Sequence, residues 1–245
     1  MKQQLLTILD NRAIAPQVYR MALKADEPVP AKPGQFLNLQ IDGCYLRRPI
    51  SVHDADGDCV TIIYKVVGRG TQMLAAMQPG QTLDALTGLG NGYDLTDSGD
   101  RPLLIGGGVG IPPLYLLAKQ LRAEGKQVRV ILGFNTASEV FCEDDFAALG
   151  CNVTVTTVDG SRGVKGFATA AMEAAPYSYV YTCGPEPMLR AVYRASKTGG
   201  QFSFEERMGC GFGVCLGCPC KTITGYKRIC KDGPVLRKEE ILWED

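Results

Sequence analysis

The chain has 245 residues, which is enough for one or two domains with a substantial core. Its 26 basic and 26 acidic side chains balance, so we expect neither a nucleic-acid-binding surface nor an interaction with anionic lipid. The most apolar window, 103–117, is interrupted by glycines and prolines, which excludes a membrane span, and residues 1–7 lack the apolar core of a signal peptide. With ten cysteines, we therefore expect a cytoplasmic protein whose thiols serve metal binding or packing.

Residues 1–98 are predicted to form short strands separated by turns. Strong turn signals lie at 32–34, 54–58 and 78–80, where Pro, Gly and Asp cluster. Six strands are expected, at 5–9, 17–23, 35–41, 49–53, 60–67 and 82–87. This spacing favours a small antiparallel barrel with one helix at 71–77.

From Arg101 onward the pattern changes to alternating strands and helices. Apolar strands are expected at 102–105, 128–134, 152–158 and 179–183. Helices are expected at 113–124, 139–149, 165–175 and 186–198. This alternation favours a parallel sheet with helices on both faces. The last forty or so residues are too few for a complete ferredoxin domain and are predicted to form a small appended lobe.

The most informative segment is 205–230, which is rich in cysteine and glycine. Cys210, Cys215, Cys218 and Cys230 have four, two and eleven residues between them, a spacing typical of the thiolates that hold a [2Fe-2S] cluster in plant-type ferredoxins. Glycines at 209, 211, 213 and 217 allow the backbone to approach a cluster and to direct N–H groups at its sulfurs. An electron carrier is the first hypothesis.

Alternatives to this ligand set remain. Cys220 is a fifth cysteine in the segment, and we prefer Cys230 as the fourth ligand because Cys218 and Cys220 would have to serve from one short turn containing proline. A structural zinc site would usually need a second Cys-x-x-Cys or a pair of histidines, which the sequence lacks. A redox-active Cys-x-x-Cys pair would be expected to open a helix in a small α/β domain.

Two loops in the barrel half carry ligand chemistry. The first is Arg48, Pro49, Ile50 and Ser51, where a guanidinium could clamp a phosphate and a hydroxyl could bond to a flavin ring. The second runs from Ile63, Tyr64 and Lys65 to the turn containing Gly70 and Thr71. That turn enters a helix and offers free N–H groups to a pyrophosphate. The alternatives are a solvated turn and an ordinary turn between a strand and a helix.

Two further loops follow strands of the α/β half. The glycine-rich run 106–112 contains Gly107, Gly108 and Gly110 and lies where a dinucleotide binds in a doubly wound sheet. It departs from G-x-G-x-x-G because Ile111 stands where the motif requires Gly or Ala, so a plain Rossmann dehydrogenase fits poorly. The second loop, Cys183, Gly184 and Pro185, is expected at the same edge of the sheet.

These motifs, in this order, resemble those of the ferredoxin-NADP reductase superfamily. The added cysteine loop, followed by Lys231, Asp232, Gly233 and Pro234, narrows the resemblance to the electron-transfer subunits of type B dihydroorotate dehydrogenases. The resemblance implies a multi-domain α+β protein: an FAD-binding antiparallel β-barrel (1–98), a doubly wound α/β NAD-binding domain (99–203) and a [2Fe-2S] lobe (204–245). Ile50 stands where many superfamily members carry a tyrosine that stacks on the flavin.

The resemblance also implies which residues bind which cofactor. FAD is assigned to Arg48, Pro49, Ile50, Ser51, Ile63, Tyr64, Lys65, Gly70 and Thr71. NAD is assigned to Gly107, Gly108, Gly110, Cys183, Gly184 and Pro185. The cluster is assigned to Cys210, Cys215, Cys218 and Cys230. The preference for NAD over NADP rests on the resemblance.

The function implied by the resemblance is electron transfer. An FMN-containing catalytic subunit oxidises dihydroorotate, and electrons pass through the cluster and FAD to NAD⁺ in pyrimidine biosynthesis, within a heterotetramer of two subunits of each kind. This chain then needs no general acid or base, and we assign no role to its one histidine, His53. The alternatives are a related flavin iron–sulfur reductase acting between NAD(P)H and ferredoxin or polysulfide, and a zinc-stapled binding module.

Overall fold

Six antiparallel strands close into the predicted barrel in the computed structural model, which describes residues 1–243. They are β1 (Lys2–Ala15), β2 (Val18–Ala25), β3 (Phe36–Leu39), β4 (Arg48–Asp56), β5 (Cys59–Lys65) and β6 (Thr82–Leu89), paired in the order β1-β2-β5-β4-β3-β6. The expected helix is α1 (Arg69–Ala76). Alternate residues such as Leu6 and Ile8 of β1 and Met21 and Leu23 of β2 fill the barrel, because successive side chains of a strand point to opposite faces.

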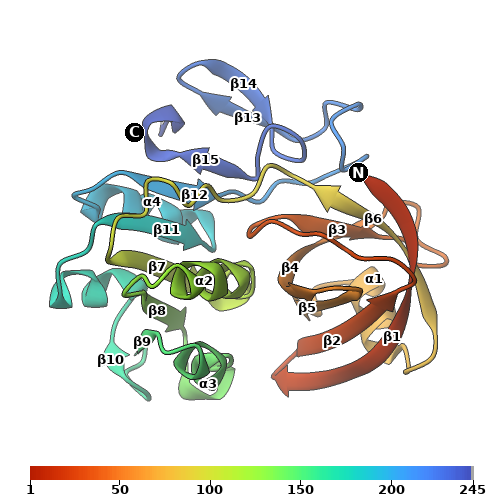
Figure 1. The fold of residues 1–245 in the computed structure, drawn as a ribbon, viewed down its shortest axis with the longest axis horizontal. Coiled ribbons are helices and arrows are strands. Elements are labelled where there is room, and N and C mark those ends of the chain that lie inside the picture. The colour runs from red at the N-terminus through yellow and green to blue at the C-terminus, as the bar shows by residue number, and fades with distance from the viewer. Residues whose placement is uncertain (244–245) are drawn as a thin grey trace.

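The second half forms a seven-stranded sheet beside the barrel (Figure 1). Its strands are β7 (Pro102–Gly107), β8 (Arg129–Phe134), β9 (Asn152–Thr157), β10 (Val164–Lys165), β11 (Tyr179–Cys183), β12 (Gly200–Ser203) and β15 (Val235–Arg237), in the order β10-β9-β8-β7-β11-β12-β15. Its α-helices are α2 (Pro113–Ala123), α3 (Glu143–Ala148) and α4 (Glu186–Ala195). The predicted alternation of parallel strands and helices is confirmed for β7, β8, β9 and β11.

Two predicted helices differ from the structure. The 165–175 segment forms the two-residue strand β10 and a 3₁₀ helix, η3 (Ala168–Ala174). Ala175 is extended because it precedes Pro176, and Phe167 is extended as well, so only a short helical window remains, in which the tighter 3₁₀ form is common. The predicted helix at 139–149 is interrupted: a 3₁₀ turn, η2 (Ala137–Glu139), precedes the six-residue α3.

The C-terminal lobe is joined to the sheet more closely than the sequence indicates. Its hairpin, β13 (Pro219–Thr222) and β14 (Gly225–Arg228), lies above the other two parts in Figure 1. After the hairpin, β15 pairs antiparallel with β12 and becomes the edge strand of the α/β sheet. A short 3₁₀ helix, η4 (Lys238–Glu240), follows. The cysteine segment is therefore held between two ordered strands, β12 and β15.

The three parts share apolar cores. Val18 and Ile63 of the barrel pack in one cluster with Leu117 of α2 and Phe146 of α3. A second cluster includes Phe36 and Leu89 of the barrel, sheet residues such as Ile105, and Cys218 and Cys230 of the lobe. No helix among residues 1–243 is long and apolar enough to cross a lipid bilayer.

Candidate cofactor sites

The four predicted cluster ligands lie in two pairs. The backbone N–H of Cys210 donates to the Sγ of Cys215 at 3.4 Å, and the N–H of Cys230 donates to the Sγ of Cys218 at 3.4 Å. Cys218 and Cys230 are buried, whereas Cys215 is exposed and Cys210 is intermediate. The loop therefore brings one thiol pair into the protein interior and leaves the other near its surface.

The backbone around Cys210 favours a thiolate. Its Sγ accepts hydrogen bonds from the N–H groups of Phe212 (3.5 Å) and Val214 (3.3 Å). Burial opposes ionisation, but hydrogen bonds from the backbone of Cys215, Phe212 and Val214 outweigh it and lower the pKa of Cys210 to about 6. Because thiolates are the form that ligates iron, this loop has the chemistry of a metal-binding segment.

Cys230, in the buried pair, favours the protonated thiol. Burial, followed by the adjacent Cys218 and by the charge of Cys210, raises the pKa of Cys230 to about 12. Four thiols this close repel one another when ionised, and a bound cation removes that repulsion.

Glycine is required at several positions of this loop. Gly211 and Gly213 adopt φ values of +83° and +92°, which side chains other than glycine rarely adopt. A Cβ on Gly209 would lie 3.1 Å from the Sγ of Cys215, and one on Gly217 would lie 3.3 Å from the same atom. Close backbone approach to sulfur therefore explains these two glycines, which do not have positive φ.

Cys220 differs from the other four cysteines of the segment in its hydrogen bonding. It is partly buried on β13, and its Sγ is 3.8 Å from the carbonyl oxygen of Lys221. Burial and the charges of Glu206 and Glu186 raise its pKa, with no contribution from the other cysteines. The geometry therefore favours Cys230 over Cys220 as the fourth ligand.

The barrel brings two predicted flavin segments together. Arg48, Pro49, Ile50 and Ser51 begin β4, and a Cβ on Gly70 would lie 2.4 Å from the Nε of Arg48. The guanidinium therefore lies directly against the first turn of α1, whose leading N–H groups have no partners within the helix. A cation beside free N–H groups is suited to a phosphate.

Other predicted flavin residues have structural partners. Thr71 Oγ1 accepts hydrogen bonds from the N–H groups of Val67 and Gly68, so its side chain stabilises the start of α1. Tyr64 is buried in the barrel and donates its hydroxyl to Asn11 Oδ1 at 2.9 Å, and Ile63 packs in the core shared with the α/β domain. Lys65 is exposed. Ile63 and Tyr64 therefore have only backbone groups available for a ligand.

The two predicted nicotinamide loops lie side by side at the carboxyl edge of the sheet. β7 leads into a 3₁₀ turn, η1 (Gly108–Gly110), and β11 pairs with β7 so that Cys183 is opposite Gly106. A Cβ on Gly110 would lie 2.3 Å from the carbonyl oxygen of Cys183, so only glycine allows the loops to touch. Gly108 has a φ of +51° and faces open space.

The order in which the chain adds strands to the sheet reverses between β7 and β11. From β7 the chain proceeds outward through β8, β9 and β10, and then returns to β11 and β12 on the other side of β7. The carboxyl ends of β7 and β11 thus flank a topological switch point, which is the usual ligand site of open α/β sheets. Burial raises the pKa of Cys183 in this loop to about 12, so its thiol is protonated at neutral pH.

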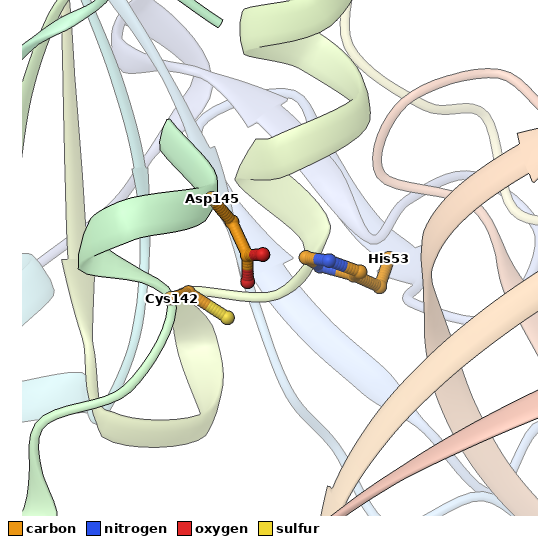
Figure 2. Close-up of side chains that lie close together, drawn as sticks. All are labelled: His53, Cys142 and Asp145. Carbon is orange, nitrogen blue, oxygen red and sulfur yellow. The ribbon is translucent and has the colours of Figure 1, made fainter. Parts of the chain in front are cut away.

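His53 belongs to a polar cluster between the barrel and the α/β domain. Its side chain, Cys142 and Asp145 lie close together in Figure 2, with their potential ligand atoms within 4.8 Å of one another. Arg20 occupies this cluster: it donates to His53 Nε2 at 2.9 Å and to Asp145 Oδ2 at 3.0 Å. A guanidinium at this position repels a metal ion, so the cluster is an interdomain contact.

Two residues that join these sites carry no signal in the sequence. Asn38 of β3 donates from its side-chain amide to the carbonyl oxygen of Cys210 at 3.2 Å. Tyr93, in the connection after the barrel, donates its hydroxyl to the carbonyl oxygen of Thr182 at 3.0 Å, beside the Cys183 loop. Neither residue belongs to a motif, and both contacts join positions far apart in the chain.

Comparisons with known proteins match two parts of the chain. Residues 205–242 match a model described as the iron–sulfur cluster binding domain of dihydroorotate dehydrogenase B, and residues 104–194 match an oxidoreductase NAD-binding domain. A solved structure titled as an NADH-dependent reduced ferredoxin-NADP oxidoreductase is similar, with a TM-score of 0.89 and 30% identity over 97% of this chain and 90% of that chain.

Two curated relatives are similar over nearly their whole length. The chain is 42% identical to a protein of Bacillus pumilus, covering 98% of both chains, and 44% identical to one of Bacillus caldolyticus, covering 97% of both. Both are named electron transfer subunits of dihydroorotate dehydrogenase B (NAD(+)). With its paired cysteines, its barrel and its glycine loops, the chain belongs to the family of dihydroorotate dehydrogenase B electron transfer subunits.

Proposed function

We propose that the chain carries electrons from an FMN-containing catalytic subunit, which oxidises dihydroorotate, to NAD⁺ in pyrimidine biosynthesis. The observation that carries this proposal is the paired arrangement of Cys210 with Cys215 and of Cys218 with Cys230, in a segment held between the strands β12 and β15. The proposal also takes support from the relatives' names, which describe NAD(+)-dependent electron transfer subunits.

The residues present fit a [2Fe-2S] cluster. Such a cluster has two irons, each with two thiolate ligands, and the chain supplies two thiol pairs. We assign Cys210 and Cys215 to one iron and Cys218 and Cys230 to the other. The N–H groups of Phe212, Val214 and Gly217 donate to the sulfurs of the outer pair and would remain directed at them when metal is bound.

The barrel residues fit a flavin dinucleotide. Arg48, with the first turn of α1 at Gly70, would hold the pyrophosphate, while Ser51 on β4 offers a hydroxyl to the ring system. Pro49 and Ile50 offer apolar surface, and Ile63, Tyr64 and Lys65 contribute the backbone of the adjacent strand β5. Thr71 would keep the helix turn in its binding conformation.

The loops at the switch point fit a nicotinamide dinucleotide. Gly107, Gly108 and Gly110 would let the backbone approach the pyrophosphate, and Cys183, Gly184 and Pro185 would border the nicotinamide. Cys183 acts in this proposal as a neutral, packed side chain, because burial keeps its thiol protonated.

The proposed role of each cofactor follows from whether it exchanges single electrons, a hydride or both. When bound, the cluster transfers single electrons, the nicotinamide accepts a hydride, and the flavin can do both. The chain's own residues hold these groups in sequence: the cysteine segment lies against β3 through Asn38, β3 pairs with the flavin strand β4, and Tyr93 connects the barrel exit to the Cys183 loop.

The proposal also includes the boundaries of the three domains, the partner subunit and the cellular location. We assign residues 1–98 to the FAD domain, 99–203 to the NAD domain and 204–245 to the cluster lobe, although β15 of the lobe also completes the sheet of the NAD domain. The partner is the FMN-containing catalytic subunit, in a heterotetramer of two subunits of each kind. The ten unpaired cysteines support a reducing, cytoplasmic location.

A second function has one observation in its favour. The similar structure with 30% identity is titled as an NADH-dependent reduced ferredoxin-NADP oxidoreductase, so a flavin iron–sulfur reductase that acts on ferredoxin is the alternative. A tagged pull-down from the native organism separates the two functions. We expect an FMN protein to be captured and the eluate to reduce NAD⁺ when dihydroorotate is added. Capture of a different dehydrogenase, with no response to dihydroorotate, would instead establish the alternative.

A further inference from the structure

Asn38 makes a contact between the barrel and the cysteine segment that nothing in the sequence indicates. It lies in the middle of β3 and is 1% exposed, and its Nδ2 donates to the carbonyl oxygen of Cys210 at 3.2 Å. In the register of β3 with β4, Asn38 is opposite Pro49 and Leu39 is opposite Arg48. The strand that carries the contact is therefore paired with the strand proposed to hold FAD.

The residues on both sides of this contact allow the Asn38 amide to approach Cys210 closely. A Cβ on Gly211 would lie 2.3 Å from Asn38 Nδ2, so the amide reaches Cys210 only because the next residue is glycine. The Asn38 backbone is itself held, since its carbonyl oxygen accepts a hydrogen bond from Arg47 Nη1 at 3.2 Å, and Arg47 also bonds to the Asp84 carbonyl oxygen at 3.1 Å. The amide thus extends from a fixed strand.

Burial of the Asn38 side chain is energetically unfavourable if the side chain only fills space. Within residues 1–243, Asn38 Oδ1 is buried and has no hydrogen-bond partner. An orphaned buried acceptor has lost its hydrogen bonds to water without a replacement, and an apolar side chain of similar size would avoid this loss. An asparagine at this position therefore indicates that the amide serves a purpose other than filling the barrel wall.

We propose that Asn38 is a positioning residue that fixes the Cys210 segment against the flavin barrel and thereby sets the reduction potential of the cluster. The inference rests on the cofactors of the proposed function. The N–H groups of Phe212 and Val214, which donate to Cys210 Sγ, lie two and four residues after the anchored carbonyl group in the chain. Hydrogen bonds to cluster sulfurs raise the potential because they stabilise the more negative reduced state. Loss of the anchor loosens these bonds and lowers the potential.

The test compares two Asn38 variants with a matched control. Asn38→Leu removes the amide at similar size, and Asn38→Ser, which is too short to reach Cys210, provides a smaller replacement if leucine is not accepted. The control is Asn91→Leu. Asn91 also ties the barrel exit to the C-terminal segment, through the carbonyl oxygen of Asp232 (3.3 Å) and through Val235 (Nδ2 to carbonyl oxygen 2.7 Å, N–H to Oδ1 3.1 Å), and none of these hydrogen bonds goes to a cysteine.

The measurement is an anaerobic redox titration of the full chain, with the cluster followed by electron paramagnetic resonance and FAD by absorbance. We expect both Asn38 variants to retain iron and FAD at wild-type stoichiometry, to show a lower cluster potential and an altered resonance, and to leave the FAD potential unchanged. Asn91→Leu should leave the cluster potential at the wild-type value.

Two results would overturn the inference. One is an unchanged cluster potential and resonance in an iron-loaded Asn38 variant. The other is an equal shift in Asn91→Leu, which would show that any loosening of the lobe has the same effect. Failure of the proposed cofactor assignment looks different, because wild-type protein would then lack iron and sulfide or FAD, and the inference would fall with it. Failure of the dihydroorotate assignment alone, seen in the pull-down, would leave the inference standing.

Discussion

Arg20 of the barrel and Asp145 of the α/β domain form an ion pair across the domain boundary, with Nη2 and Oδ2 3.0 Å apart. The same guanidinium donates to His53 Nε2, and His53 Nδ1 is 3.1 Å from the carbonyl oxygen of Pro112 at the start of α2. Because a carbonyl oxygen only accepts, Nδ1 carries the proton and Nε2 accepts from Arg20. One chain of hydrogen bonds therefore connects β2, β4, α2 and α3.

Removal of Arg20 should weaken the domain boundary. Arg20→Met leaves Asp145 and His53 Nε2 without this donor, and we expect the free energy of unfolding to fall by about 1–3 kcal/mol. The matched control is Arg12→Met, because Arg12 pairs with Asp10 on the exposed surface of the barrel and should contribute no more than about 0.5 kcal/mol. Denaturant titration of both variants makes the comparison; equal losses would contradict the interdomain role.

His53 should remain neutral at pH values well below the usual pKa of a histidine. Burial, and then the charge of Arg20, lower its pKa from 6.5 to about 4, while the hydrogen bond to Pro112 and the charges of Asp145 and Asp54 act in the opposite direction. Between pH 6.5 and 4 the unfolded chain takes up a proton that the folded chain does not. Stability therefore falls as the pH falls through this window, by up to about 3 kcal/mol, and is fully present above pH 6.5.

The pKa of His53 can be measured directly because the chain has one histidine. Nitrogen–proton correlation spectra should show a neutral ring with the proton on Nδ1 and no titration between pH 8 and 5.5. His53→Gln should abolish the extra acid sensitivity of the unfolding free energy. A ring that titrates near 6.5 would show that the Arg20 contact is absent in solution.

The cysteine assignment predicts a sharp difference between neighbouring positions. Cys210→Ser, Cys218→Ser and Cys230→Ser should each lower the cluster content or change its resonance, because each removes a thiolate ligand. Cys220→Ser should retain iron and sulfide at wild-type levels, because Cys220 Sγ contacts the carbonyl oxygen of Lys221 and is not assigned as a ligand. Iron analysis and electron paramagnetic resonance under anaerobic conditions distinguish these outcomes. An unchanged cluster signal in Cys210→Ser would disprove the ligand set.

Gly110→Ala should affect the nicotinamide loops. A Cβ at this position would lie 2.3 Å from the Cys183 carbonyl oxygen and 2.6 Å from the Cα of Gly184, so the two loops must separate. We expect NADH to bind at least tenfold more weakly, which corresponds to about 1.4 kcal/mol. Gly57→Ala is the control: it strains a φ of +58° in open space on the barrel and should leave the dissociation constant for NADH unchanged.

Local patterns predicted much of this molecule. The spacing of Cys210, Cys215 and Cys218 indicated a cluster because the ligands lie on one loop, and the alternation of strands and helices after Arg101 indicated the parallel sheet. The sequence could not show that β15 pairs with β12, since a three-residue strand carries little periodicity. Nor could it show the Asn38 contact, because a single asparagine in a strand has no motif and its partner lies 172 positions away.

The interdomain contacts of His53 could not be predicted either, because its partners are distant in the sequence. A lone histidine near a strand end is usually packed or solvated, and the hydrogen bonds of this fully buried ring go to Arg20 and Pro112, which come from two other elements. The 3₁₀ form of η3 depended on the combined effect of Phe167 and Ala175 at its two ends, whereas helical periodicity reports only on the residues between them.

The central claim is that electrons from dihydroorotate pass through the cysteine segment of this chain to NAD⁺. The most direct measurement is electron paramagnetic resonance of the complex with its catalytic subunit, frozen after dihydroorotate is added without NAD⁺. The account predicts a reduced-cluster signal that disappears when NAD⁺ follows, with NADH formed, and no NADH from the complex containing Cys210→Ser. NADH formation at the wild-type rate by a complex that has lost its cluster would contradict the account.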